Sequence, residues 1–437
     1  MTVPFSMGEA RGMWDEFMTL LWTKGVPSTH TWAAYMAFFV VQILLAAVAP
    51  GLTMEGLPTA PHGKRLKYHC NGYAAFYACV VCLFVADYTA VNYGIGYDLT
   101  HMASNFGEYL IASIIIGDLT SLYWYVYGLM VDQPGSSAPT GNIAYDFFMG
   151  TVLYPRIDFG LGTFEVDIKM VAEARWSWVT LFLLTLSCAI KQFRDTGSVS
   201  GQMGIMVLAH WLYANATVKG EHCIPCTWDM FHEKFGWMLN FWNISGVPFL
   251  YCFQSFYVLQ NQTMVDASFP YNVIVGGYRP FTFFLLVWLL LAYYLFDSAN
   301  GQKAYLKSPI KRGTFPTVPW VYIEEPAEYI VTPKGKLLVD GWYAFARKIQ
   351  YTGDIMMALA WGMATGFTSL LPYFYALFFT SMITHRQWRD EIRCSEKYGK
   401  HWEEYTSLVP NVFLPPLSFY KWLFFGGPHP TKDRKRK

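Results

Sequence analysis

A dense block of charged and aromatic residues follows the long charge-free stretch Ile355–Thr384. Its members are His385, Arg386, Trp388, Arg389, Asp390, Glu391, Cys394, Lys397, Tyr398, Trp402, Glu403, Glu404 and Tyr405. Cationic side chains bind anions through charge-assisted hydrogen bonds, and aromatic faces pack on flat rings. The block therefore predicts a site for a polar, anionic ligand at the boundary of a membrane, where a lipid and a soluble compound could meet.

A second dense region, Ala209–Asn215, places polar residues in an apolar setting. Within it, Tyr213 is a candidate proton donor, because a phenol can work in a greasy pocket where a charged carboxylate would be costly. The commoner alternative is a packed ring whose hydroxyl bonds a backbone carbonyl. Asp390 is similarly open: it could be a general acid, an orienting group, or the ion partner of Arg386 or Arg389.

Metal and redox sites receive little support from the sequence. Asp229, His232 and Glu233 share one helical face, which fits either a metal site or the ion-paired start of a helix. The sequence has no second cluster of residues with the spacing of metal ligands. The ion-paired start of a helix is therefore favoured, and no metal is expected. Cys223 and Cys226 form an isolated CxxC, and the other cysteines are expected to act mainly as small hydrophobes.

The composition is that of a membrane protein. Of 437 residues, 14% are charged, whereas soluble domains carry about 25%. Several stretches approach or exceed the ~20 apolar residues of a bilayer span: Thr31–Met54, Asn71–Ala86, Tyr109–Val131, Trp176–Ile190, Phe235–Val265, Pro280–Phe296 and Ile355–Thr384. We expect an all-α, polytopic transmembrane bundle of about eight to ten spans, broken at Pro248 and Pro372. Asp87 and Asp118, inside apolar runs, fit a structural carboxyl or a transport role.

One extended polar stretch, Asp297–Asp354, precedes the last apolar stretch and is rich in lysine and arginine. It predicts a short strand at Leu337–Val339 after a turn at Pro333–Lys336. A single helix over Ile355–Thr384 would measure about 45 Å, more than the ~30 Å hydrocarbon thickness. We therefore expect two helices folded back at Pro372. That fold would put the polar stretch and the His385–Tyr405 block on one side of the membrane, where they can form one pocket.

The two ends of the chain carry further signals. Trp14, Phe17 and Leu21 share one helical face and predict an interfacial helix within residues 1–30. The basic end Lys432–Lys437 is expected in the cytosol, as a solvated tail or a retention signal of the endoplasmic reticulum. The formal net charge is +1, and no basic run is interleaved with aromatic residues, so no nucleic acid is expected as a partner. A dinucleotide would not bind through a Rossmann fold, because no GxGxxG follows a strand.

The ordered motifs resemble those of the integral-membrane sterol reductases, the family of sterol C-14, C-7 and C-24(28) reductases. The resemblance covers residues 60–420 and rests on Tyr145–Gly150, Pro155–Arg156, Asp167–Met170, Lys191–Gln192, Ala209–Asn215, Thr227–Asp229, Gly246–Pro248, Asp297–Lys303, Asp340–Tyr343, Ala346–Arg347 and the His385–Tyr405 block. Within the family, Leu208–Asn215 with Lys219–Glu221, and Phe241–Pro248, are most similar to the fungal C-24(28) reductases of ergosterol synthesis. The other two branches tend to carry an acidic residue at the position of Asn243.

The resemblance implies NADPH as the cofactor, held in a C-terminal pocket on the cytosolic side. It assigns to that pocket Lys303, Lys307, Leu338, Tyr343, Gln350, Tyr351, Asp390, Cys394, Ser395, Glu396, Lys397, Tyr398 and Tyr405. Three of these depart from the family pattern. Lys307 replaces a usual arginine and loses bidentate phosphate contact. Tyr343 stands at a frequent tryptophan position, and Gln350 replaces the asparagine of the C-7 branch.

The resemblance also assigns catalysis to Tyr213 and Asp390, in the reduction of a side-chain double bond, Δ24(24(1)) or C-24(28), late in ergosterol-type synthesis. An isolated alkene accepts hydride poorly. We therefore expect protonation by Tyr213, with Asp390 orienting or resupplying the proton, followed by hydride transfer from NADPH to a tertiary cation at C-24. A dry aromatic pocket suits this order, because water would trap the cation. The motifs leave the C-24(25) bond open as well.

Other interpretations share some of these residues. A sterol C-14 or C-7 reductase would use the same scaffold. Isoprenylcysteine-type methyltransferases have a similar C-terminal pattern of histidine, arginine and glutamate, but they are shorter and lack Tyr145–Gly150 and Ala209–Asn215. A lamin-binding receptor built on the reductase scaffold carries an N-terminal chromatin-reading domain, for which we expect no room before Thr31. The cofactor lysines and Tyr213 also favour an active enzyme.

These observations predict four parts: an interfacial segment (1–30), a sterol-binding transmembrane bundle (31–296), a cofactor-binding part with the last spans (297–425) and a basic cytosolic tail (426–437). The implied location is the membrane of the endoplasmic reticulum, as a multi-pass protein. The implied partners are a sterol substrate, the lipid bilayer and other sterol-biosynthesis enzymes.

Overall fold

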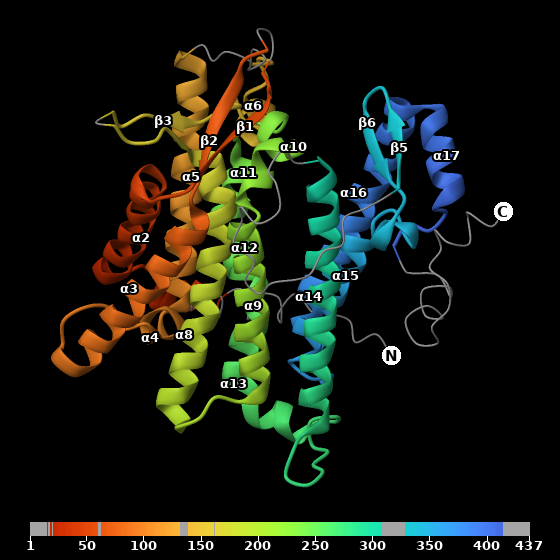
Figure 1. The fold of residues 1–437 in the computed structure, drawn as a ribbon. Helices are drawn as coiled ribbons and strands as arrows, with labels where there is room; N and C mark the ends of the chain where they lie inside the picture. The colour runs from red at the N-terminus through yellow and green to blue at the C-terminus, as the bar shows by residue number, and fades with distance from the viewer. Residues whose placement is uncertain are drawn as a thin grey trace. The chain divides into compact units, whose positions relative to one another are not determined.

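The computed structural model describes residues 15, 18–19, 21–59, 63–131, 139–160, 162–307 and 328–413. Most of them are helical (Figure 1). The chain divides into two compact units, the first made of residues 1–199 and 213–259, the second of residues 200–212 and 260–437. The division falls within the helices α9 (Gly201–Lys219) and α13 (Phe253–Ala267).

The first unit is a bundle of helices with two small antiparallel sheets, β1–β2 and β3–β4. Apart from α9 and α13, its helices and strands are α2 (Thr29–Val48), β1 (Leu52–Pro58), β2 (Arg65–Cys70), α3 (Gly72–Tyr93), α4 (Thr100–Ser104), α5 (Phe106–Met130), α6 (Ile143–Met149), β3 (Arg156–Ile157), β4 (Val166–Asp167), α7 (Ile168–Val171), α8 (Trp178–Thr196), α10 (Trp228–Phe231), α11 (Trp237–Phe241) and α12 (Val247–Tyr251). Single π-helical turns lie at Leu21–Gly25, Ala172–Ser177 and Trp242–Gly246, and a 3₁₀ turn at Glu221–Cys226.

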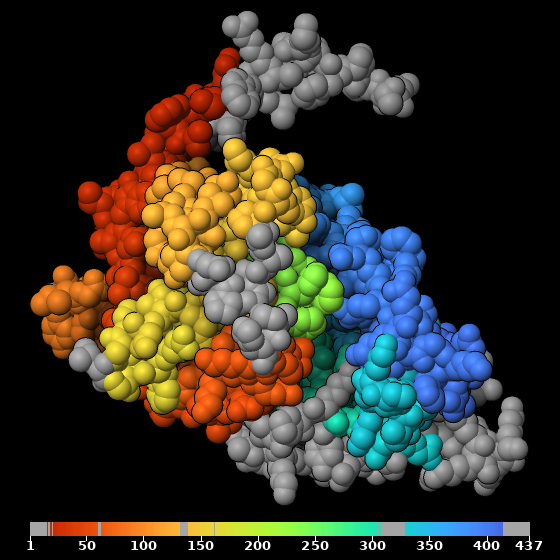
Figure 2. All heavy atoms as spheres, turned by 90° about the horizontal axis from the view of Figure 1, so that it is seen from above, coloured from red at the N-terminus to blue at the C-terminus, as the bar shows by residue number. Residues whose placement is uncertain are grey.

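The second unit contains α14 (Pro280–Lys307), β5 (Tyr329–Thr332), β6 (Gly335–Leu338), α15 (Ile349–Met363), α16 (Phe374–Tyr398) and α17 (Lys400–Leu408), with 3₁₀ turns at Gly341–Ala344 and Leu371–Tyr373. β5 and β6 form an antiparallel hairpin with a two-residue turn, and the hairpin packs on α17. Figure 2 shows this hairpin in cyan beside the blue C-terminal helices. The strand predicted at Leu337–Val339 is therefore confirmed as β6, which begins two residues earlier than predicted.

Five helical segments in the described ranges are long and apolar enough to cross a membrane: Thr29–Val48, Gly72–Tyr93, Phe106–Met130, Ile168–Thr196 and Pro280–Ala304. They agree with a polytopic helical membrane protein. The larger number of eight to ten spans stays a prediction. The three hairpins show that the protein is not purely α-helical. Of these hairpins, only a strand of β5–β6 was expected.

Of the two breaks predicted in the long apolar stretches, the one at Pro372 is present and the one at Pro248 is not. α15 ends at Met363, a 3₁₀ turn containing Pro372 follows, and α16 begins at Phe374 and packs back on α15. The stretch Phe235–Val265 is broken twice, at the π turn Trp242–Gly246 and at Cys252. Pro248 itself lies in α12, directly after the π turn, where the backbone stays helical. Of the predicted interfacial helix, Trp14 and Phe17 lie outside the described residues, as does the basic tail.

Two of the ordered motifs have scaffolding roles in the first unit. The ammonium of Lys169, which is fully buried, donates to the carbonyl oxygens of Leu153, Met230 and Glu233 at 2.9, 3.1 and 2.7 Å. The backbone of Gly150 (φ +98°) lies so close to Gly236 that a Cβ atom on Gly150 would sit 2.4 Å from the Gly236 nitrogen. These contacts join the loop after α6 and the start of α7 to the segment around α10.

A buried ion pair fixes the start of α3. Arg175 and Glu221 have side chains only 1% and 2% exposed, and Arg175 Nη2 lies 3.1 Å from Glu221 Oε1. Glu221 Oε2 also accepts the backbone N–H of Gly72 at 2.6 Å, and Arg175 donates to Asn71. N–H groups at a helix N-terminus lack intrahelical partners. A carboxylate there accepts their hydrogen bonds and also interacts favourably with the positive end of the helix dipole.

Replacing Glu221 by Ala is expected to destabilise the protein by about 3–5 kcal/mol, because it leaves a buried guanidinium without its anion. The midpoint of thermal unfolding in detergent measures the loss. Asp195→Ala is the matched control: Asp195 pairs with Lys191 at 2.9 Å, their side chains are 52% and 31% exposed, and exposed pairs contribute about 0–1 kcal/mol. Equal shifts of the two midpoints would contradict the prediction.

Candidate functional site

Asp390 lies at the centre of a charged cluster in the second unit. Its Oδ2 accepts a hydrogen bond from Lys348 Nζ, just before α15, and its Oδ1 accepts one from Arg393 at 2.6 Å. The ion partners that the structure gives Asp390 are thus Lys348 and Arg393, and its pairing with Arg386 or Arg389 stays a prediction. Burial raises the pKa of Asp390, but Lys348 and Arg393 outweigh it and lower the pKa to about 2. Burial lowers the pKa of Lys348, and Asp390 more than compensates. Both groups are therefore charged at neutral pH.

Arg347, the residue before Lys348, binds Glu391, the residue after Asp390. Its Nε and Nη2 donate to the two carboxylate oxygens of Glu391 at 3.2 and 3.0 Å, and its Nη1 donates to the carbonyls of Val409 and Pro410 at 2.6 and 2.9 Å. Such a bidentate pair fixes direction as well as distance. The start of α15, the middle of α16 and the segment after α17 are thus tied together around Asp390.

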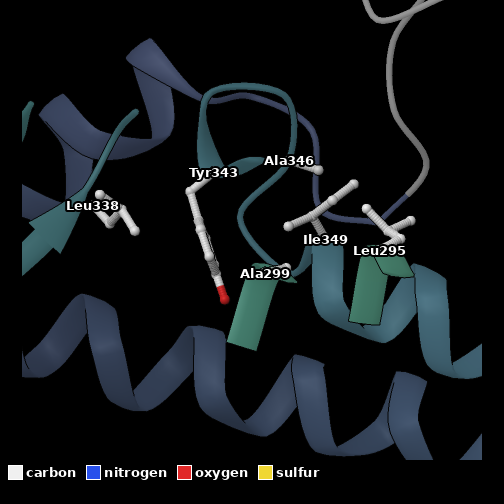
Figure 3. Close-up of a cluster of buried hydrophobic side chains, with 6 residues drawn as sticks. All are labelled: Leu295, Ala299, Leu338, Tyr343, Ala346 and Ile349. Atoms are coloured by element: carbon white, nitrogen blue, oxygen red, sulfur yellow. The ribbon is translucent and has the colours of Figure 1, made fainter. Parts of the chain in front are cut away.

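Ile349, which follows Lys348 in the chain, belongs to a cluster of buried apolar side chains that forms a first wall (Figure 3). Leu338 and Tyr343 pack with Leu295 and Ala299 of α14 and with Ala346 and Ile349. Tyr343 is 2% exposed, and its hydroxyl donates to Gln350 Oε1 at 3.1 Å. Two of the three residues that depart from the family pattern, Tyr343 and Gln350, therefore contact each other. The hydrogen bond satisfies the buried phenol and fixes its ring.

A second wall comes from the hairpin and α17. Leu337 and Val339 pack with Trp402, Tyr405 and Val409, and the half-buried Cys394 and Tyr398 lie against them. This arrangement confirms that the polar stretch and the His385–Tyr405 block lie together. It follows from the break at Pro372, which returns the chain to the side from which α15 started.

The structure distributes the predicted pocket residues unevenly. Seven of them, Leu338, Tyr343, Gln350, Asp390, Cys394, Tyr398 and Tyr405, belong to the two walls and the charged cluster. Ser395, Glu396 and Lys397 are exposed on α16, and Lys303 is half-buried on α14. Tyr351, half-buried, has its ring 6.3 Å from that of Phe413. The side chain of Lys307 lies outside the described residues.

Sequence reasoning missed Lys348 as a site residue. It stood only among the many cations of Asp297–Asp354, and its partner Asp390 is far along the chain. The one usable signal is its place directly before an apolar helix, where a charged side chain is costly without an anion.

Tyr213 lies in α9, in the part of this helix that belongs to the first unit. It is half-buried, and its ring centroid is 4.5 Å from that of Trp178, which lies 6.2 Å from Tyr251. Nearby in α9, Asn215 is fully buried and accepts from the Tyr77 hydroxyl at 2.8 Å. The phenol of Tyr213 therefore sits among aromatic rings, an environment that suits a proton donor to an apolar compound.

Two π-helical turns pack on each other in the same unit, Ala172–Ser177 before α8 and Trp242–Gly246 before α12. π turns occur frequently at functional sites because they insert an extra residue and redirect side chains. The second contains Asn243, which is 7% exposed and whose amide nitrogen has no hydrogen-bond partner among the described residues. No sequence pattern predicts a π turn, and these two were not foreseen.

The other ionisable candidates have structural partners. Asp87 pairs with Arg194 at 2.7 Å, and Asp118 accepts from the indole of Trp237 at 2.8 Å. Glu233 accepts from the indole of Trp228 at 2.6 Å. Cys223 and Cys226 are free thiols. Among the described residues, no three His, Cys, Asp or Glu side chains are grouped so as to hold a metal ion.

Comparison with known proteins decides the family. Residues 5–418 match the family described as "Ergosterol biosynthesis ERG4/ERG24 family". The chain belongs to this family. The resemblance seen in the motifs is thereby confirmed, and it extends beyond residue 60 toward the N-terminus.

Three relatives illustrate the range of the family. The chain is 40% identical over 413 residues to a Delta(24(24(1)))-sterol reductase of Gibberella zeae, an alignment that covers 92% of the chain and 65% of that protein. It is 36% identical over 416 residues to the Delta(24(24(1)))-sterol reductase erg4A of Aspergillus fumigatus (92% and 83% covered). It is 33% identical over 399 residues to a Delta(14)-sterol reductase of Methylotuvimicrobium alcaliphilum (91% and 85% covered). The chain thus spans just under two thirds of the Gibberella relative.

Proposed function

We propose that this protein is a membrane-bound sterol reductase that saturates the Δ24(24(1)), or C-24(28), double bond of a sterol side chain. The observation that carries the proposal is the sequence identity of 40% and 36% to two reductases named for that bond, against 33% to a Δ14 reductase. The proposed location is the membrane of the endoplasmic reticulum, where other enzymes of sterol biosynthesis would be its partners.

The second unit fits NADPH as the cofactor. A phosphorylated dinucleotide needs cations for its phosphates and flat apolar surfaces for its rings. Lys303 and Lys397 would supply charge, Leu338, Tyr343 and Tyr405 apolar and aromatic surface, and Asp390 an ionised acceptor held by Lys348 and Arg393. When bound, NADPH supplies hydride for the reduction.

Tyr213 is the proposed proton donor to the alkene. Aromatic rings near it, Trp178 and Tyr251, would keep water away and stabilise positive charge on the sterol through their faces. Asp390 is ionised at neutral pH and carries no proton to give, so its proposed part is to orient the proton donor as a hydrogen-bond acceptor.

The test is expression in a yeast strain that lacks its own C-24(28) reductase, followed by mass spectrometry of the sterols. Restored ergosterol is the expected result, and it reports both the chemistry and the bond. An unchanged profile, with the protein present in membranes and binding NADPH, would contradict the assignment. Strains blocked at the C-14 or C-7 reduction would then show whether the same scaffold acts on another ring bond.

A further inference from the structure

A largely apolar cavity of about 380 Å³ lies between α2, α3, α4, α5 and α8 in the first unit. This volume is in the range of sites that take small organic ligands. Small residues line its walls on two helices, among them Ala34 and Ala37 of α2 and Ala78 and Ala86 of α3. Their short side chains leave space for the flat face of a ligand. The cavity thus offers a smooth surface rather than an interlocked one.

The cavity is elongated along the helices. Asn71 at the start of α3 donates to the carbonyl of Leu45 near the end of α2, so the two helices are antiparallel. The cavity wall on α2 extends from Ala34 to Leu45, a length of about 16 Å at the rise of an α-helix. A long, flat and rigid ligand suits this shape.

The cavity opens toward lipid. α2 and α3 are membrane-span candidates, with only 33% and 17% of their most apolar windows buried. Val41, which lines the cavity, is 43% exposed, and Cys82 is exposed as well. A hydrophobic compound dissolved in the bilayer could enter between these two helices without crossing water.

One end of the cavity carries a polar cluster. Tyr97 and Tyr109 both line it, and their hydroxyl oxygens are 2.7 Å apart. His101 Nδ1 lies 3.0 Å from the Tyr109 hydroxyl, and the ring of His30 stacks on Tyr97. A tyrosine hydroxyl can donate once and accept twice. Whichever tautomer His101 adopts, the Tyr97 hydroxyl keeps capacity for one more hydrogen bond, and a ligand hydroxyl could take it.

A second polar group faces the cavity. Thr180 of α8 lines it, is 1% exposed, and its hydroxyl has no hydrogen-bond partner among the described residues. An unsatisfied hydroxyl at that depth is costly. A ligand or a water molecule accompanying it would remove the cost.

Charge selects among the lipids that could fill such a space. Three acidic residues lie near the Tyr97 end: Asp87, Asp98 and Glu108. The cations near them are Arg194, which binds both aspartates, and the exposed Lys24. A phosphate or a fatty-acid carboxylate would meet more negative than positive charge there. A neutral lipid with a single hydroxyl meets no such penalty.

The cavity is separate from the proposed proton donor. Trp178 of α8 packs on Tyr213. Thr180 follows two residues later, about 200° around the helix. The cavity and Tyr213 therefore lie on opposite faces of α8.

We propose that this cavity is a second, non-catalytic sterol site, with the sterol hydroxyl at Tyr97 and the ring system along the alanines of α2 and α3. The choice of a sterol rests in part on the proposed function, which gives the protein access to sterols. The cavity shape, the polar end and the charge argument are independent of it.

The experiment uses the full chain in phosphatidylcholine nanodiscs and a photoreactive sterol with a free 3-hydroxyl. Mass spectrometry is expected to find the label on peptides of α2 and α3. Ala78→Phe and Cys82→Phe, which fill the cavity, should abolish that labelling. Val81→Phe, on the same helix but 61% exposed and outside the cavity wall, should leave it intact. Tyr97→Phe should weaken competition by unlabelled sterol about 5- to 10-fold, as expected for one hydrogen bond.

Two results would overturn the proposal. One is labelling of α2 and α3 that persists in both cavity-filling variants. The other is a fatty-acid probe that labels the same peptides and competes as well as the sterol, which would make the cavity a general lipid groove. Labelling needs neither NADPH nor turnover. A failure here is therefore distinguishable from a failure of the reductase assignment, which the yeast sterol profile tests.

Discussion

Replacing Tyr213 by Phe is expected to lower turnover about 10²- to 10⁴-fold, the range associated with loss of a positioned proton donor. The substitution removes one oxygen and keeps the ring that packs on Trp178. Because an isolated alkene takes hydride only after protonation, the loss should appear in turnover and leave sterol and cofactor binding nearly unchanged. Product formation by the purified protein in detergent measures turnover, and fluorescence titration measures NADPH binding.

Tyr123→Phe is the matched control for this prediction. It makes the same chemical change on α5, at a tyrosine that is 57% exposed, and it should leave turnover unchanged. Turnover of Tyr213→Phe equal to that of the control would reject Tyr213 as the donor. Loss of NADPH binding together with turnover would instead mean that the hydroxyl acts in the structure of the site.

Much of the fold could be predicted from the sequence because bilayer thickness limits the length of a membrane-spanning helix. An apolar stretch of the length of Ile355–Thr384 with a central proline has to fold back, and the hairpin of α15 and α16 follows from that limit. The same limit predicts that Lys348 and Asp390 lie on one side of the membrane. Motif resemblance supplied the family, which local physics alone could not.

The contacts that define the site could not be predicted in the same way. Lys348 and Asp390 meet only because α16 packs back along α15, and neither residue is unusual in its local sequence. The π turns at Ala172–Ser177 and Trp242–Gly246 depend on how α8 and α12 pack, and propensity does not encode them. The spacing of Asp229, His232 and Glu233 predicted that they share one face of a helix. In the structure α10 ends at Phe231, so the helical spacing does not continue through all three.

Removing the cation beside Asp390 is expected to make the enzyme sensitive to acid. In the wild type, Lys348 and Arg393 lower the pKa of Asp390 to about 2. The folded pKa lies below the unfolded value of about 3.9. The pair therefore stabilises the protein above that unfolded value and loses its contribution only as the pH falls through about 2. Between pH 4.5 and 8 the carboxylate stays ionised, and kcat/KM should show no acidic limb from this group.

Lys348→Met removes the buried cation beside Asp390, whose side chain is 20% exposed, and leaves Arg393, whose side chain is 52% exposed. Burial then opposes ionisation, so the pKa of Asp390 should rise and an acidic limb should enter the pH profile of kcat/KM. Asp390→Asn should lower turnover about 10²-fold, at the lower end of general acid–base effects, without any such limb, since nothing is left to titrate. Lys397→Met, which removes an exposed cation on the same helix, should weaken NADPH binding and leave the pH profile flat.

The double variant Lys348→Met/Asp390→Asn separates catalysis from packing. Breaking a buried ion pair from one side costs about 3–5 kcal/mol, whereas removing both charges costs much less. The double variant should therefore regain thermal stability relative to either single one, with a large coupling energy. Its turnover should stay low, because the carboxylate that orients the proton donor is gone. Recovery of turnover together with stability would show that Asp390 serves only as the counter-ion of Lys348.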